Sequence, residues 1–414
     1  MASNAKPPLI LLACMTFGNV MALIQDQNLP NRKNHVFMMG QQNMVNPVAL
    51  KYKDGRNTKM TWKTPQTKES PVSLRDQRMK AASVISVKRT PCLPSDGLAC
   101  GPGTRWRRHC SSGLCLPGPR EHCYVPCNYT AYFSPSEDDV AFYLYTKKQP
   151  KGIRYTTKTW QKVPSELLFG TVRFFVHGWL HNHESGYSMD MVRQLNLNRD
   201  QPSSAVFSVD WGRLAGSKIF FPSCDATEFV GRTLAKFIKL LEKKGASRRR
   251  MHLVGFSLGG KVVSAAGRNL RSPKVARISG IDSPTGCLIL SCGANLQSGD
   301  ASFVDSLHNT FISGPTQQAH ADFYPNGPHE CPKEIILHPI RTILTIHAMH
   351  KMAVNYYINS INKCRFSALA CPGWKSFPDH CELKPNRMGF YAKMPPGGIR
   401  KKYYLAPKET DPPC

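Results

Sequence analysis

The stretch MHLVGFSLGGKVVSAAG, residues 251–267, decides the fold. A β-prone run at 252–254 leads into a G-x-S-x-G pentapeptide at 255–259, and small residues follow. This layout is typical of a nucleophile elbow, in which Ser257 occupies a strained turn between a strand and a helix. The glycines allow the two backbones to come close. The elbow predicts an α/β fold with a mostly parallel sheet.

A serine of this kind needs two partners. Its hydroxyl becomes a good nucleophile when an imidazole removes the proton and a carboxylate orients that imidazole. Downstream, VARISGID (275–282) is a strand-like run ending at Asp282, and active sites of open α/β sheets collect at such strand ends. Asp305 and Asp322 are the alternative carboxylates. The residues alone do not choose among the histidines that follow, which are His308, His320, His329, His338, His347, His350 and His380.

Several short stretches between Ser136 and the C-terminus match a known family in its order. They include FFVHGW (174–179), SVDWGRLAG (208–216), GFSLGG (255–260), SGIDSPTG (279–286) and HKMAVNYYINSI (350–361). On these stretches the chain resembles the pancreatic-lipase family, whose fold is the α/β-hydrolase fold. The resemblance is closest to its single-domain arthropod branch of neutral lipases, phospholipases A1 and lipase-like yolk proteins.

The resemblance implies a catalytic site. The family's catalytic aspartate falls on Asp282, and its histidine, which precedes a YY-x-x-SI run, falls on His350. The backbone N–H groups of Leu258, after the nucleophile, and of Trp179, after His-Gly, are the expected oxyanion donors. No metal and no cofactor are expected.

The sequence also departs from the family pattern near these residues. Phe256 and Lys261 stand where the family usually has histidines, and Ala348 and Met352 replace a cysteine and an arginine on either side of the catalytic histidine. Ser-Pro rather than Pro-Ala follows the aspartate. We therefore expect the loop that carries His350 to be less constrained than in relatives, and loss of positioning alone can cost about 10²-fold in rate.

The N-terminus predicts secretion. Residues 1–22 combine Lys6, an apolar stretch at 9–17 and a Val-x-Ala pattern at 20–22, as a secretory signal peptide does. A membrane anchor is the alternative, but it needs roughly 18 apolar residues. Cys14 lies in the signal, so an even number of cysteines enters an oxidising compartment. We expect a secreted, extracellular protein.

Two further segments precede the lipase-like region, which we place at 128–414. Residues 23–90 are polar and basic without an apolar period, which predicts a disordered linker or pro-segment. Residues 91–127 hold six cysteines and predict a small disulfide-rich module. A zinc site is the alternative there, but the C-x₂-C pairs of zinc sites are missing. Asn128 begins an Asn-Tyr-Thr sequon and is the expected glycosylation site.

The charge balance bears on partners. The chain carries a formal net charge of +28, and a helix-period segment at 229–241 has a basic face, which continues toward 248–250. Nucleic acid is not expected, because aromatic residues are not interleaved with the basic ones in a stacking pattern. Attraction to anionic head groups is worth about 1 kcal/mol per basic residue, which suits peripheral contact with a membrane or lipid droplet. A simple solvated face is the alternative.

The segment from Cys331 to His350 occupies the family's lid position. It is unusually apolar for a surface loop, as a lid over a lipid-binding cleft would be, with burial as a core element the alternative. Cys371 and Cys381 match a disulfide of the family, whereas Ala348 leaves Cys331 without its family partner. The chain ends before the position of the family's C-terminal β-sandwich, so no colipase is expected.

Together these features predict a secreted serine carboxylester hydrolase. Its substrate would be an acyl lipid at a lipid–water interface, cut through an acyl-enzyme on Ser257, and triacylglycerol lipase and phospholipase A1 activities both remain open. The alternative is a lipase-fold lipid-binding or yolk-type storage protein without turnover. Loss of the nucleophile marks that class, and here Ser257, Asp282 and His350 are all present.

Overall fold

The computed structural model describes residues 110–111, 114–115, 135–217, 220–285, 293–315, 318–329, 339–408 and 413–414. The chain divides into one unit of residues 33–128 and another of 1–32 with 129–414. In the first unit, β1 (Cys110–Ser111) pairs antiparallel with β2 (Leu114–Cys115). The predicted signal peptide, the linker and Asn128 lie outside the described residues.

One sheet dominates the larger unit. Among the described residues it has eleven strands in the order β12-β11-β13-β10-β9-β8-β7-β5-β6-β3-β4. The centre, from β6 to β13, is parallel, while β3, β4, β11 and β12 are antiparallel to their neighbours. This confirms the mostly parallel sheet. The strands are β3 (Ala141–Thr146), β4 (Gln149–Tyr155), β5 (Val172–Val176), β6 (Ala205–Asp210), β7 (Met251–Phe256), β8 (Arg277–Ile281), β9 (Phe303–Leu307), β10 (Ala321–Pro325), β11 (Ser367–Ala370), β12 (Asn386–Arg387) and β13 (Lys401–Leu405).

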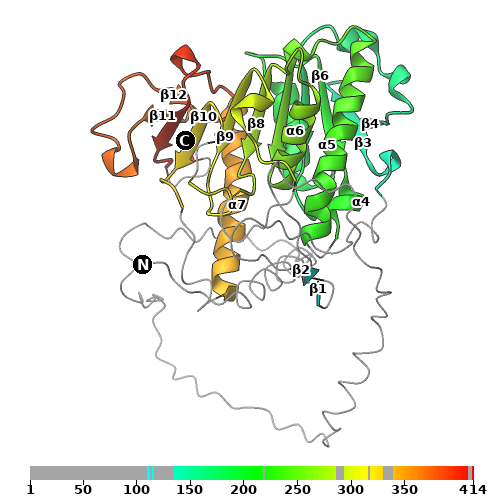
Figure 1. Cartoon of the computed structure of the whole chain (residues 1–414). Coiled ribbons are helices and arrows are strands. Elements are labelled where there is room, and N and C mark those ends of the chain that lie inside the picture. Colours follow the sequence, from blue (N-terminus) through cyan, green and yellow to red (C-terminus); the bar gives the residue numbers. More distant parts are fainter. Residues whose placement is uncertain are drawn as a thin grey trace, which may run out of the picture. The chain divides into compact units, whose positions relative to one another are not determined.

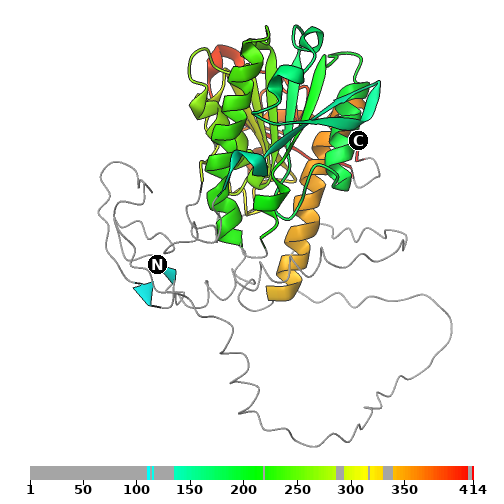
Figure 2. The ribbon, with the colours of Figure 1, turned by 90° about the vertical axis from the view of Figure 1, so that its right-hand side faces the viewer.

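Helices cover both faces of the sheet (Figures 1 and 2). The α-helices are α3 (Gly186–Leu197), α4 (Gly212–Ala215), α5 (Phe220–Glu242), α6 (Leu258–Asn269) and α7 (Pro339–Asn362). Short 3₁₀ turns are η2 (Glu137–Asp139), η3 (Trp160–Lys162), η4 (Ser165–Leu167), η5 (Arg248–Arg250), η6 (Ser298–Asp300), η8 (Trp374–Ser376) and η9 (Pro396–Gly398). Side chains of α5 and α6 share one core cluster with the sheet, and those of α3 and α7 share the other.

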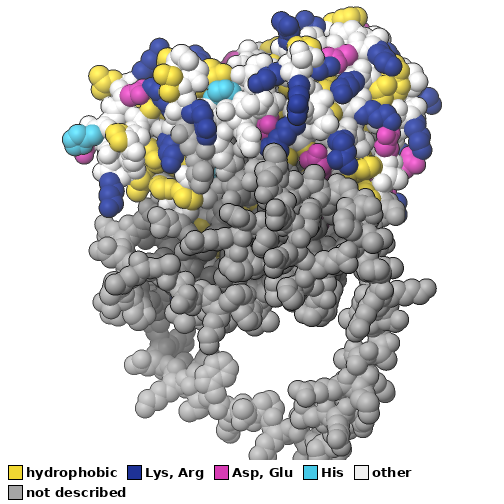
Figure 3. Space-filling model, in the orientation of Figure 1, with side chains coloured by type: hydrophobic (Ala, Val, Ile, Leu, Met, Phe, Trp, Pro, Cys, Tyr) yellow, Lys and Arg dark blue, Asp and Glu magenta, His cyan; other side chains and the backbone are white. Residues whose placement is uncertain are grey.

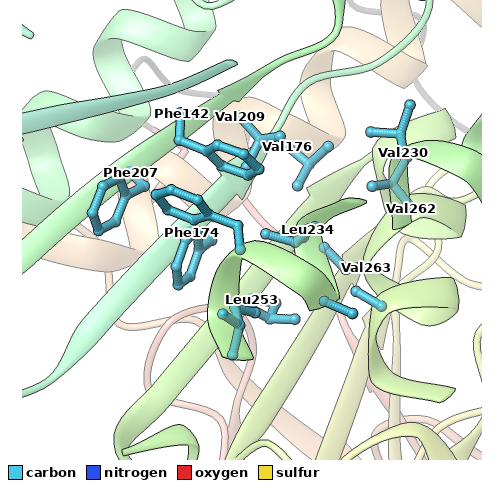
Figure 4. Packing of buried hydrophobic residues seen from close by; sticks show 14 of the residues in the cluster. Phe142, Phe174, Val176, Phe207, Val209, Val230, Leu234, Leu253, Val262 and Val263 are labelled. Atoms are coloured by element: carbon cyan, nitrogen blue, oxygen red, sulfur yellow. The ribbon is translucent and has the colours of Figure 1, made fainter. Parts of the chain in front are cut away.

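The packing of α5 against α6 explains the small residues after the elbow. Figure 4 shows apolar side chains of the central strands facing those of the two helices. The helices approach closely at Gly231, where an added Cβ would lie 2.8 Å from the carbonyl oxygen of Val262 and against the side chain of Ala265. Larger residues on this face of α6 would push α5 away from the sheet.

Helix α5 has the predicted amphipathic form. Leu234, Phe237 and Leu241 are buried, whereas Lys236 and Lys239 are exposed on the other face. On the face that Figure 3 shows, lysine and arginine side chains are spread over the described surface rather than gathered in one patch. The basic face is also partly neutralised, since Lys236 Nζ lies 2.6 Å from Glu137 Oε1.

The predicted continuation of the basic face into 248–250 is wrong at its first residue. Arg248 is buried, and its guanidinium binds both carboxylate oxygens of Glu242, with Nε 2.6 Å from Oε1. Arg249 and Arg250 remain exposed. The arginine turns inward because a buried guanidinium is tolerated when a carboxylate pairs with it.

The segment at the family's lid position, 331–350, differs from the expectation in its secondary structure. Residues 330–338 lie outside the described part, but from Pro339 onward the chain is one helix, α7, which passes through His350 and ends at Asn362. The expectation that His350 lies on a loop is therefore wrong. Figure 2 shows the first turns of α7, in orange, extending beyond the end of the sheet, whereas later residues such as Val354 and Tyr357 are buried in the second core cluster.

Two disulfides are described in full. Cys371 and Cys381 are joined, with an S–S distance of 2.03 Å, and Cys364 is joined to Cys414. Cys224 is disulfide-bonded as well. Within the described residues, no helix combines the length and the apolar character that crossing a membrane requires.

Candidate active site

Ser257 occupies the turn between β7 and α6. Its backbone has φ 55° and ψ −126°, a region that non-glycine residues rarely adopt. The turn is tight because Gly255 and Gly259 approach each other, and an added Cβ on Gly259 would collide with the carbonyl oxygen of Val176. The backbone N–H of Ser257 donates to the carbonyl of Ile281 at 2.9 Å, which ties the elbow to the end of the next strand.

Asp282 follows directly on that next strand, β8, and is fully buried. Its carboxylate accepts bonds from backbone N–H groups of Asn309 (2.8 Å) and Thr310 (3.0 Å), and from hydroxyls of Thr310 (2.8 Å) and Ser313 (2.6 Å). Burial alone raises the pKa of this carboxyl, but hydrogen bonds from His350, Ser313 and Asn309 outweigh it and lower the pKa below its ordinary value. Asp282 is thus held as a carboxylate.

His350 points at this carboxylate from α7. Its Nδ1 lies 2.7 Å from Asp282 Oδ2. Since a carboxylate accepts hydrogen bonds, Nδ1 carries the proton and Nε2 is left as an acceptor. The imidazole packs against Phe256, the residue before Ser257, with ring centroids 4.6 Å apart. Among the hydrogen bonds of the described residues, none joins Ser257 to His350, and such bonds often tighten when substrate is present.

The two expected oxyanion donors flank the serine. Leu258 is the first residue of α6, where a backbone N–H has no acceptor within the helix. Trp179 follows Gly178, whose backbone lies against the serine: an added Cβ there would be 2.7 Å from Ser257 Cβ. The structure thus brings Ser257, Leu258 and the 178–179 peptide together.

The loop after β9 contributes residues that the sequence did not reveal. Asn309, Thr310 and Ser313 supply the hydrogen bonds to Asp282 described above. In addition, Asn309 Nδ2 donates to the carbonyl of Met349 at 2.7 Å, next to His350. One asparagine therefore holds both the carboxylate and the helix that carries the imidazole. Two signals marked it: its place just after a strand end, and its position in the stretch DASFVDSLHNT (300–310), which resembles the family.

The alternative carboxylates have other partners. Asp305 pairs with Arg277 at 2.7 Å and accepts from Ser279, and Asp322 Oδ1 lies 2.8 Å from His308 Nε2. Within the described ranges no three side chains are arranged to hold a metal ion. Two surface hollows lined by described residues, of about 490 and 360 Å³, include none of Ser257, Asp282 and His350.

Two histidines near the site, His181 and His347, are uncharged at neutral pH, whereas the nearby Lys261 keeps most of its charge. Burial lowers the pKa of both His181 and His347 to about 4, helped by the neighbouring His350. Lys261, one turn along α6 from the serine, is buried, and its Nζ donates to Asn295 Oδ1 at 2.7 Å. Burial lowers the pKa of this lysine to about 8.

Comparison with known proteins identifies the family. A family model described as "Lipase" matches residues 125–412. The chain is 30% identical to pancreatic lipase-related protein 2 of Rattus norvegicus over 63% of this chain and 61% of the relative. It is 28% identical to pancreatic triacylglycerol lipase of Myocastor coypus (59% and 58%) and 29% identical to hepatic triacylglycerol lipase of Mus musculus (57% and 51%). It thus spans only about three fifths of the length of the first of these curated relatives. With this match and an α/β-hydrolase fold, the chain belongs to the pancreatic-lipase family.

Proposed function

We propose that this protein is a serine carboxylester hydrolase acting on acyl lipids, with Ser257, His350 and Asp282 as its catalytic triad. One observation carries the proposal. A buried carboxylate with five hydrogen bonds, one of them from His350, lies beside a serine in strained backbone geometry. Strain and a buried charge are costly, and they persist where the surrounding structure is built to hold them.

The mechanism follows from the proton positions. His350 Nε2 takes the proton of the Ser257 hydroxyl as its oxygen attacks the ester carbonyl, and Asp282 stabilises the imidazolium. The N–H groups of Trp179 and Leu258 receive the oxyanion of the tetrahedral intermediate. His350 then gives the proton to the departing alkoxide, which leaves an acyl group on the serine. Water, activated by the same imidazole, hydrolyses this ester and restores the enzyme.

The substrate class is the next step of the proposal. Relatives named as triacylglycerol lipases support an acyl glyceride, and attack at a lipid–water interface agrees with the exposed Leu344 on the first turns of α7 and with the lysines of α5. Phospholipase A1 activity is the second candidate. It is favoured by the compact connection after Asp282, which reaches Asp300 in 18 residues of sequence.

The proposal also covers the localisation, the glycosylation and the domain organisation of the enzyme. We propose that it is secreted through the signal peptide 1–22, carries a glycan on Asn128 and contacts membrane or lipid-droplet surfaces peripherally. Residues 128–414 would form the catalytic domain, and the segments 23–90 and 91–127 would be accessory to it. The disulfides agree with an oxidising compartment.

Labelling with a fluorophosphonate probe tests the proposed chemistry. We expect the full secreted protein to be labelled, Ser257→Ala to lose the label, and Ser302→Ala, an exposed serine elsewhere on the domain, to keep it. Rates on phosphatidylcholine vesicles and triacylglycerol emulsions then decide between the two substrates. An unlabelled wild type without activity on either substrate would favour a lipid-binding or storage role.

A further inference from the structure

The inference concerns the orientation of the Trp179 N–H, and it rests on the proposed function. This N–H belongs to the peptide that begins with the Gly178 carbonyl. A trans peptide is planar, so its C=O and N–H point in opposite directions. Whatever fixes the Gly178 carbonyl therefore also aims the Trp179 N–H.

His177 holds that carbonyl. Its Nδ1 lies 2.9 Å from the Gly178 oxygen, and because a carbonyl oxygen can only accept, Nδ1 must carry the proton. The other ring nitrogen, Nε2, lies 3.2 Å from the backbone N of Trp211, which donates to it. His177 is fully buried and stacks on the Trp211 indole, with ring centroids 5.6 Å apart. Its Nε2 also lies 3.5 Å from Asp210 Oδ1, and Nδ1 carries its proton whether or not Nε2 does.

His181 holds the next carbonyl along the chain. Its Nδ1 lies 2.7 Å from the oxygen of Trp179, and this nitrogen must be the donor for the same reason. The ring packs against Tyr187, with centroids 4.7 Å apart. The bond does not depend on the charge of the imidazole, because Nδ1 keeps its proton in the cation as well.

We propose that His177 and His181 are positioning residues that clamp the two carbonyls on either side of the Trp179 N–H and aim this donor at the oxyanion. The rest of the loop is fixed independently. The Trp179 indole donates to the carbonyl of Ser217 at 2.7 Å, and the Leu180 N–H donates to Ala215 at 2.9 Å. The Leu180 N–H shares its planar peptide with the Trp179 carbonyl, so this peptide is held at both ends, whereas the His177 bond sets the tilt of the 178–179 peptide that carries the donor.

The clamp matters because oxyanion donors work by preorganisation. Loss of one such donor costs about 10²–10³-fold in kcat, and a misdirected donor loses part of that. The ground-state ester places little charge on its carbonyl oxygen, so substrate binding depends less on the aim of the donor. A fault in the clamp should therefore lower kcat and leave KM nearly unchanged.

Three substitutions at His177, whose bond fixes the peptide that carries the donor, separate the clamp from simple packing. His177→Asn places an amide N–H near the position of Nδ1, whereas His177→Gln places its amide near Nε2 and His177→Leu has no donor. On a short soluble ester we expect Leu and Gln to lower kcat about 10- to 100-fold with KM within about twofold, and Asn to recover most of the loss. The rate of fluorophosphonate labelling should fall in parallel, since the phosphoryl oxygen uses the same donors.

The control is Glu184→Leu, in the same loop. Its side chain is exposed and has no bond to the carbonyls of 178 or 179. If any His177 variant is not secreted, His181→Asn against His181→Gln makes the same comparison at the neighbouring peptide. Two results overturn the clamp: a wild-type kcat in both the Leu and the Gln variant, or an equal loss of kcat in the Asn and Gln variants. Neither result affects the proposed function as long as Ser257→Ala is inactive. A wild type that never labels overturns the proposed function and the clamp with it.

Discussion

Two buried histidine–aspartate pairs in this fold are nearly identical in their central bond. His350 Nδ1 lies 2.7 Å from Asp282, and His308 Nε2 lies 2.8 Å from Asp322. Both carboxylates also accept backbone N–H bonds, the second from Gln318 and Ala319. Such a pair is therefore not in itself a mark of catalysis.

The surroundings of the two pairs differ. The His350 side chain is 12% exposed and packs beside the strained elbow, so its free nitrogen can meet a hydroxyl or a solvent molecule. The His308 side chain is 3% exposed and stacks on Tyr324 at 4.7 Å, with no bonding partner for its other nitrogen, Nδ1, in the described part of the chain. We infer that the first pair moves protons and the second holds the strands β9 and β10 together.

The largest contrast is expected from loss of the reacting groups. Ser257→Ala and His350→Ala should each reduce ester hydrolysis by about 10⁶-fold, because members of a triad act as one unit. His308→Ala should keep kcat per folded molecule near the wild type. Active-site titration followed by steady-state assays measures this, and comparable losses at His308 and His350 would erase the distinction between the pairs.

The next contrast compares the two carboxylates. Asp282→Asn should lower kcat about 10⁴-fold, since the amide favours the wrong imidazole tautomer. Asp322→Asn makes the same change in the other pair and should leave kcat of the folded fraction unaltered. If Asp322→Asn proved as damaging to kcat as Asp282→Asn, the assignment of the catalytic carboxylate would have to be reopened.

For the free energy of unfolding we expect a large effect at Asp322, where the effect on kcat is small. Asp322→Ala leaves the His308 Nε2 and the backbone N–H of Ala319 buried without an acceptor, and each such unsatisfied donor costs about 1–3 kcal/mol of unfolding free energy. Urea unfolding followed by tryptophan fluorescence measures the cost, with Lys239→Ala on the exposed face of α5 as the control substitution. A midpoint equal to the wild type would mean that the second pair is not structural.

A smaller effect is expected at Phe256, which replaces the histidine usual in the family. Its ring packs on His350, and aromatic contacts of this kind are worth about 0.5–1.5 kcal/mol. Phe256→Leu should therefore lower kcat roughly 2- to 10-fold by loosening the imidazole. Tyr324→Phe, which keeps the ring stacked on His308, should not change kcat. An unaltered rate in Phe256→Leu would show that Asp282 and Asn309 alone fix the imidazole.

The weakest effect concerns acid stability. The pKa of Asp282 is lower in the folded protein than its unfolded value of about 3.9. The stability it contributes is therefore present above about pH 4 and is lost as the pH falls through the folded pKa. Asp282→Asn should flatten the acid limb of a plot of melting temperature against pH. The limb would stay unchanged if other carboxylates dominate acid unfolding.

The elbow and the mostly parallel sheet were predictable because their signals are local. The glycines around Ser257 and the apolar run before it lie within one short stretch of the sequence. The hydrogen-bond donors to Asp282 could not be predicted in this way. Asn309 and Ser313 lie far from Asp282 in the sequence, and polar residues after a strand are common. The inward turn of Arg248 likewise depends on Glu242, six residues earlier in sequence and across a helix end. The choice of His350 needed the family pattern, because the chain offers many histidines.

The continuity of α7 constrains how the entrance to the site can move. Eleven residues separate Pro339 from His350, a rise of about 16 Å in one unbroken helix. A helix without a break has no hinge, so a push on its first turns is transmitted as a rigid tilt to the imidazole. The proposed contact of Leu344 with a lipid surface and the aim of His350 at Asp282 are then mechanically linked, because both residues lie on the same rigid helix. On this proposal, surface contact and the position of the base cannot be adjusted separately.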